Sequence, residues 1–81
     1  MREAISEDDL ARYIEQHIVR EVKISRYDGG PKWFLAVRLG GPLSKWLPVR
    51  SQRKAVRTWA KLDTLVNWAD SQGVRGAILE L

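Results

Sequence analysis

Residues 22–40, VKISRYDGGPKWFLAVRLG, decide the fold because their apolar side chains follow the period of a β-strand on both sides of a turn. In the first half, Val22 and Ile24 alternate with polar residues, which predicts a half-buried strand. The turn residues DGGP at 28–31 end that strand. In the second half, the run WFLAVRLG carries apolar residues on both faces, which is typical of a central strand. The segment therefore predicts two neighbouring strands of one sheet.

A third strand is expected over KWLPVRS at 45–51, after a Gly-Gly-Pro turn at 40–42. The alternation places Leu47 and Val49 on the inward face, with Trp46, Pro48 and Arg50 on the outward face. Because proline has no N–H group to donate, this strand should lie at an edge of the sheet or carry a bulge. The polar run that follows predicts a loop leading into a short strand near residues 56–59.

A helix is expected before the first strand. Ser6 and Asp9 have the spacing of a capping box, and Ile5 and Leu10 have that of a hydrophobic staple. The helix should therefore begin at Glu7 and run to about residue 19 or 20. Its apolar stripe consists of Leu10, Ile14 and Ile18.

A second helix is expected over LDTLVNWADSQ at 62–72, and Gly73 stands where a left-handed C-terminal cap belongs. Its apolar stripe consists of Leu62, Leu65, Val66 and Ala69, extended by Trp68. The remaining segment, VRGAILEL at 74–81, alternates Ala77, Leu79 and Leu81 against Ile78, which predicts a closing strand. We expect this strand to be inserted centrally in the sheet.

These elements predict one small α+β domain over residues 1–81. Its order is an N-terminal helix, a three-stranded antiparallel meander, a second helix and a C-terminal strand, with both helices on one face of the sheet. A composition of 44% hydrophobic and 30% charged residues is that of a folded globule. No stretch of 18 uninterrupted apolar residues and no apolar leader are present, so the expected location is the cytoplasm, without a membrane partner.

The charge is unevenly distributed along the chain, although the net charge is only +4. No acidic residue lies between Asp28 and Asp63. The basic residues in that interval are Lys32, Arg38, Lys45, Arg50, Arg53, Lys54, Arg57 and Lys61. Such a block attracts a polyanion or an acidic protein. The alternative interpretation is that these lysines and arginines only keep the outer face of the sheet hydrated.

The residues that catalysis and metal binding need are scarce. The chain has no cysteine, and His17 is its one histidine, so a site built on imidazole pairs or thiolates is excluded. The glycine pairs at 29–30 and 40–41 match no phosphate-binding loop and are interpreted as hairpin turns. The sequence therefore predicts a protein that is not an enzyme and uses no cofactor or metal.

Aromatic residues are interleaved with the basic block. Proteins that bind single-stranded nucleic acid place exposed aromatic rings among arginines and lysines, because bases stack on the rings while cations meet phosphates. Such a surface requires Tyr27, Phe34, Trp46 and Trp59 to share an outer face with Arg38, Arg50 and Arg57. The competing interpretation is that the tryptophans pack in the core, as we expect for Trp33 and Trp68.

Four features follow one another in the C-terminal part of the chain: RSQR at 50–53, VRT at 56–58 before an aromatic residue, Leu62-Asp63 opening a helix that ends at Gly73, and a final apolar strand. In this pattern, about residues 33–81 resemble a family of ParC-type partition-associated proteins of plasmids and other bacterial mobile elements. Lys61 departs from the small polar residue usual before that helix. The resemblance implies a non-enzymatic accessory protein of plasmid maintenance that contacts DNA or partition proteins.

Two hypotheses for the function follow. In the first, the basic surface binds nucleic acid, and in the second, the same surface docks on an acidic protein or inhibits a complex that handles nucleic acid. The candidate binding residues are Arg38, Trp46, Arg50, Arg53, Lys54, Arg57 and Trp59. An exposed edge at the Pro48 strand or at the final strand would also allow homodimerisation by strand pairing.

Overall fold

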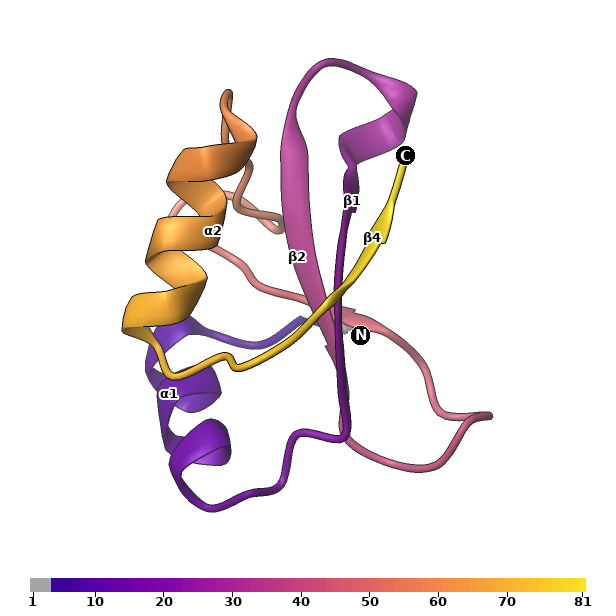
Figure 1. Cartoon of the computed structure of the whole chain (residues 1–81), viewed down its shortest axis with the longest axis vertical. Helices are drawn as coiled ribbons and strands as arrows, with labels where there is room; N and C mark the ends of the chain where they lie inside the picture. Colours follow the sequence, from indigo (N-terminus) through magenta and orange to yellow (C-terminus); the bar gives the residue numbers. More distant parts are fainter. Residues whose placement is uncertain (1–3) are drawn as a thin grey trace.

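A computed structural model describes residues 4–81 and confirms the α+β class (Figure 1). Two helices are interspersed along the chain with the four strands of one mixed sheet. In order, the elements are α1 (Glu7–Glu15), β1 (Glu21–Arg26), a 3-10 turn (Tyr27–Gly29), β2 (Trp33–Arg38), β3 (Leu47–Pro48), α2 (Leu62–Ser71) and β4 (Ile78–Glu80).

The sheet has the strand order β3-β2-β1-β4, with β1 and β2 at its centre. These two strands are antiparallel, and Val22 lies opposite Val37. This arrangement confirms the hairpin expected from residues 22–40. β4 runs parallel to β1 and forms an edge, so the expectation of a central C-terminal strand is wrong. The tight turn after β1 makes β1 and β2 direct neighbours, which leaves no gap between them for another strand.

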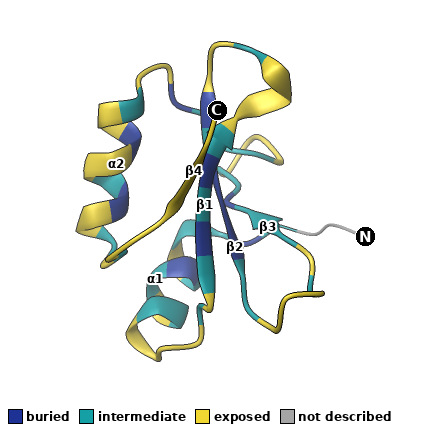
Figure 2. Ribbon diagram, turned by 45° about the vertical axis from the view of Figure 1, so that its right-hand side comes forward, coloured by how far each residue is buried: buried dark blue, intermediate teal, exposed yellow. Residues whose placement is uncertain are grey.

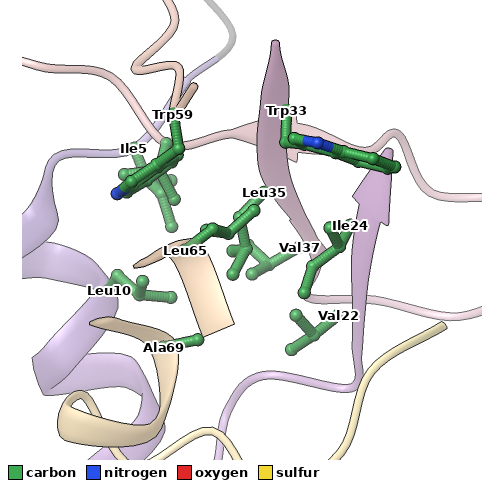
Figure 3. Close-up of a cluster of buried hydrophobic side chains, with 11 residues drawn as sticks. Ile5, Leu10, Val22, Ile24, Trp33, Leu35, Val37, Trp59, Leu65 and Ala69 are labelled. Atoms are coloured by element: carbon green, nitrogen blue, oxygen red, sulfur yellow. The ribbon is translucent and has the colours of Figure 1, made fainter. Parts of the chain in front are cut away.

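Both helices pack on one face of the sheet, as expected, and the core lies between these two layers (Figure 2). Leu10 of α1 and Leu65 of α2 are fully buried there, against Leu35 and Val37 of β2 (Figure 3). The inward residues of β1 and β2 have the predicted alternation, with Val22 and Ile24 buried. The opposite face of the sheet carries no helix, and we call it the helix-free face.

The third strand is shorter than expected, because only two residues of the 45–51 segment pair with β2. Pro48 lies on this edge, as its missing N–H group predicts. The N-terminal segment pairs with the chain around Val49. The Ile5 N–H donates to the Pro48 carbonyl at 3.0 Å, and the Arg50 N–H donates to the Ile5 carbonyl at 2.9 Å. The short strand expected near 56–59 is reduced to one bridge, between Trp59 and Trp33.

The first helix ends earlier than its apolar stripe suggests. His17 adopts a left-handed conformation with a φ of 60°, and the Ile18 N–H donates to the Tyr13 carbonyl at 2.9 Å. This bond closes the helix after Glu15 in the manner of a Schellman cap. Ile18 consequently lies outside α1 and is 40% exposed, so its assignment to the stripe is wrong.

The second helix has the predicted extent and cap. Gly73 has a φ of 98°, and the Val74 N–H donates to the Ala69 carbonyl at 3.1 Å, which is the bonding pattern of a Schellman motif. Leu65 and Ala69 are buried as expected. Val66 is not buried, since 46% of its surface is exposed.

Candidate nucleic-acid interface

The candidate residues occupy three separate places in the structure. Arg38 and Trp46 lie on the helix-free face of the sheet. Arg50, Arg53 and Lys54 belong to an exposed loop after β3, which we call the basic loop (residues 50–54). The last two, Arg57 and Trp59, lie in an internal cluster beside α2.

On the helix-free face, Trp46 is held between two cations. The guanidinium carbon of Arg38 lies 4.3 Å from the centre of a Trp46 ring, and the Lys23 amine lies 4.6 Å from it. Both distances are within the range of cation–π attraction. Trp46 is half-buried, so part of its surface remains accessible. The outward direction predicted for this side chain is therefore confirmed.

Two further aromatic residues lie beyond the other end of the same face. Phe34 points to the same side of β2 as Arg38, since the two positions differ by an even number of residues. The Tyr27 ring meets the Phe34 ring edge to face, with 6.0 Å between their centres. Tyr27 is 43% exposed, so part of its surface is accessible.

The cations of the helix-free face already have acidic partners. Nε of Arg38 donates to the Glu21 carboxylate at 2.7 Å, and a second nitrogen of the guanidinium group also contacts it. The Lys23 amine lies 3.6 Å from the Glu80 carboxylate. These pairs hold the cations over Trp46 and reduce the net positive charge of the face. Lys23 was not among the expected site residues, although its position opposite Ala36 in the register of the hairpin places it on this face.

The basic loop gathers three cations that have no acidic partner within residues 4–81. The Ser51 hydroxyl accepts from the Lys54 N–H at 3.0 Å, and the Ser51 N–H donates to the Lys54 carbonyl at 3.1 Å, so the loop is closed on itself. Arg53 and Lys54 are exposed and Arg50 is half-buried. Within residues 4–81, none of these three side chains forms an ion pair. A loop with three such cations attracts a polyanion.

The internal cluster buries Trp59 and engages Arg57, which stays half-buried, in an ion pair. Arg57 donates to the Glu7 carboxylate at 2.5 Å, and its guanidinium carbon lies 4.6 Å from the Trp59 ring and 5.2 Å from the Trp68 ring. The Trp59 and Trp68 rings are themselves 5.1 Å apart. Trp59 is only 5% exposed, so the hypothesis that its ring receives a base is wrong (Figure 3).

The core role expected for the other two tryptophans is confirmed in most respects. Trp33 is 8% exposed, and Arg26 covers its ring at 4.4 Å. Trp68 is half-buried and packs against the core cluster. His17, expected within the first helix, lies just beyond its end and is exposed.

In residues 4–81, neither a metal-ligand cluster nor a membrane-spanning helix is found. No group of histidine, cysteine, aspartate or glutamate side chains in that range is arranged to hold a metal ion. None of the helices in the same range has the length and the apolar run that crossing a bilayer requires. The candidate residues instead combine cations, aromatic rings and a sheet face that no helix covers, and such a surface suits the binding of a nucleic acid or of an acidic protein.

Comparison of the chain with protein-family models, with curated proteins and with solved structures finds no match. The resemblance to partition-associated proteins therefore stays a prediction.

Proposed function

We propose that the protein is a non-enzymatic accessory protein that binds nucleic acid, with the basic loop as its contact to the phosphate backbone. One observation carries this proposal: Arg50, Arg53 and Lys54 lie together in an exposed loop, and none of them has an acidic partner within residues 4–81. Cations of this kind release counterions when they meet phosphates, which supplies affinity for any nucleic acid.

The helix-free face provides the second part of the interface. Trp46, Pro48 and Arg50 are alternate residues of one extended segment, so the chain leads from the Trp46 ring to the basic loop over about 13 Å. A strand whose phosphates lie on the loop can therefore extend its bases over the face that bears Trp46 and Phe34. Stacking requires unpaired bases, which favours a single strand over a duplex.

The biological setting that we propose is the maintenance of a plasmid or another mobile element. It rests on the resemblance of residues 33–81 to partition-associated proteins. In that setting the protein would contact DNA directly and act beside the partition proteins, without catalysing a reaction.

A second candidate function is docking on an acidic protein. It is favoured by the small size of the unpaired basic surface, because Arg38, Lys23 and Arg57 are all neutralised by carboxylates of the same chain. A short basic loop fits an acidic patch of a partition protein or of a complex that handles nucleic acid. This candidate predicts no retention of DNA at moderate salt.

The test is fluorescence anisotropy of labelled single-stranded and double-stranded DNA of equal length, with an R53E/K54E variant. The matched control is R20E/K61E, which exchanges two exposed cations elsewhere and changes the net charge from +4 to 0 in the same way. We expect the loop variant to lose at least tenfold in affinity and the control to lose much less. Equal losses in both variants would mean that only the net charge matters, and no binding by the folded wild-type protein would leave docking on an acidic protein as the function.

A further inference from the structure

A row of three side chains crosses the helix-free face at the level of Phe34. Ser25 of β1 lies opposite Phe34 of β2 and beside Glu80 of β4, and these three strands are neighbours in Figure 1. Directly paired residues share one face of a sheet, and the contact of Glu80 with Lys23 places its carboxylate on the same face. The row therefore sets an aromatic ring, a small polar residue and a carboxylate side by side, about 4.8 Å apart from strand to strand.

The middle of this row is a gap, because serine is much smaller than the two residues that flank it. Ser25 and Phe34 are half-buried, and the Glu80 side chain is 56% exposed. The Lys23 amine lies 3.6 Å from the Glu80 carboxylate, which is too far for a hydrogen bond. The carboxylate therefore keeps its capacity to accept hydrogen bonds from a group that enters the gap.

On its other side the row continues into the basic loop. The Val49 N–H donates to the Leu35 carbonyl at 3.0 Å, which extends the antiparallel pairing of β2 and β3 toward Phe34. Arg50 follows directly and stands beside the Phe34 end of β2. The order across the face is then a cation, a ring, a small polar residue and a carboxylate. A nucleotide has matching parts in the same order, since its phosphate is followed by a base with a flat surface and a polar outer edge.

The carboxylate determines which base fits. An ionised carboxylate accepts hydrogen bonds and donates none. On the Watson–Crick edge of guanine, N1–H and the N2 amino group are adjacent donors that one carboxylate accepts together. Adenine and cytosine place a ring-nitrogen acceptor next to their amino group, and thymine places a carbonyl oxygen on each side of its N3–H. Each of these three bases thus turns an acceptor toward the carboxylate. A single strand exposes this edge, whereas a duplex conceals it.

We propose that Arg50, Phe34, Ser25 and Glu80 form a subsite for one guanine nucleotide of a single strand. Arg50 meets the phosphate, the base stacks on Phe34 and fills the gap above Ser25, and Glu80 accepts from N1–H and from the N2 amino group. This subsite rests on the proposed binding of nucleic acid. It adds a preference for one base, which the basic loop alone does not supply because phosphate contacts carry no sequence information.

The preference is measured by fluorescence anisotropy with thymine strands of equal length that carry guanine, hypoxanthine or thymine at one central position. We expect the guanine strand to bind roughly fivefold more tightly than the all-thymine strand, or better, as for a good bidentate contact to a base. Hypoxanthine keeps the N1–H group and the flat surface of guanine but lacks its N2 amino group. The strand with hypoxanthine should therefore lose most of the gain, which separates the contact with Glu80 from stacking.

Two variants test the residues of the row. E80Q removes the charged acceptor and should bind the guanine and hypoxanthine strands equally. The matched control is E15Q, which removes the same charge from an exposed glutamate of α1 and should keep the preference. S25V leaves every charge in place and suits a strand, but its branched side chain fills the gap and should also abolish the preference.

Failure of the subsite and failure of nucleic-acid binding give different results. Equal binding of all three strands by the wild-type protein would overturn the guanine subsite and leave the proposed function intact. A preference for guanine that E80Q retains would also overturn it. If the folded wild-type protein binds none of the strands, the proposed function fails, and the subsite fails with it.

Discussion

Arg57 shows how a single side chain is committed to the fold rather than to a ligand. It joins the loop after β3 to the start of α1 through Glu7, and it covers two tryptophan rings. The sequence places this arginine in a basic block, and only the fold reveals an acidic partner that lies 50 positions earlier in the chain.

Substitution of Arg57 is therefore expected to reduce stability. R57A should lower the free energy of unfolding by about 1–2 kcal/mol, from the loss of one partly exposed ion pair and of the contacts with the rings. Urea denaturation followed by tryptophan fluorescence measures the change. R53A serves as the control and should stay within about 0.5 kcal/mol of the wild-type protein. Equal stability of R57A and R53A would contradict the structural role of Arg57.

Substitution of Tyr27 best separates the contribution of base stacking to DNA binding from the contribution of charge. Its ring is exposed and touches Phe34 only at an edge, so its removal should leave the fold intact. Y27A should weaken single-stranded DNA binding by about 1 kcal/mol or more, the lower end of the range for one stacked base. Anisotropy with both forms of DNA measures this, and the weak duplex binding that the basic loop alone supports should be unchanged. A loss of the same size for duplex DNA would argue against stacking at Tyr27.

At the scale of the elements, short sequence patterns correctly predicted those turns and helix ends that depend only on residues close together in the chain. The hairpin of β1 and β2 and the end of α2 at Gly73 follow from short-range patterns. So does the cap at Ser6, whose hydroxyl accepts from the Asp9 N–H at 3.1 Å. The position of β4 and the role of Ile5 beside Val49 depend on segments distant in sequence, and no period in the sequence encodes them. The sequence does not predict the end of α1 after Glu15. The residue with the left-handed conformation there is His17, whereas the usual sign of a C-terminal cap is a glycine or an asparagine.

Substitutions at the C-terminal ends of the two helices should change the free energy of unfolding in opposite directions. H17G should raise the free energy of unfolding by up to about 1 kcal/mol, because glycine adopts a positive φ without the steric cost that histidine has. G73A should lower it by about 1–2 kcal/mol, since its φ is 98° and an added Cβ would lie 3.1 Å from the Ile14 side chain. Denaturation midpoints of both variants measure the effects. Destabilisation by H17G would contradict this account of the cap.

At the scale of the whole molecule, the fold converts a continuous basic block into separate parts with different roles. The sequence predicted correctly that Trp33 packs in the core. A shared outer face for Trp46 and Arg38 was only a condition of the binding hypothesis, and the structure brings these two side chains together. It grouped Arg57 and Trp59 with the binding surface, because the charge and aromatic character of a residue do not show which side chains fold over it. The helix-free face, the basic loop and the β4 edge all remain accessible.

The central claim is that the basic loop binds phosphates, and the salt dependence of DNA binding tests it most directly. With Arg50, Arg53 and Lys54 in contact with single-stranded DNA, the logarithm of the binding constant should fall with the logarithm of the salt concentration with a slope of about −2, since each phosphate contact contributes about −0.7. In the R53Q/K54Q variant the slope should shrink to about −0.7, the contribution of one remaining contact. An unchanged slope in that variant would show that the phosphates are held elsewhere and would contradict the claim.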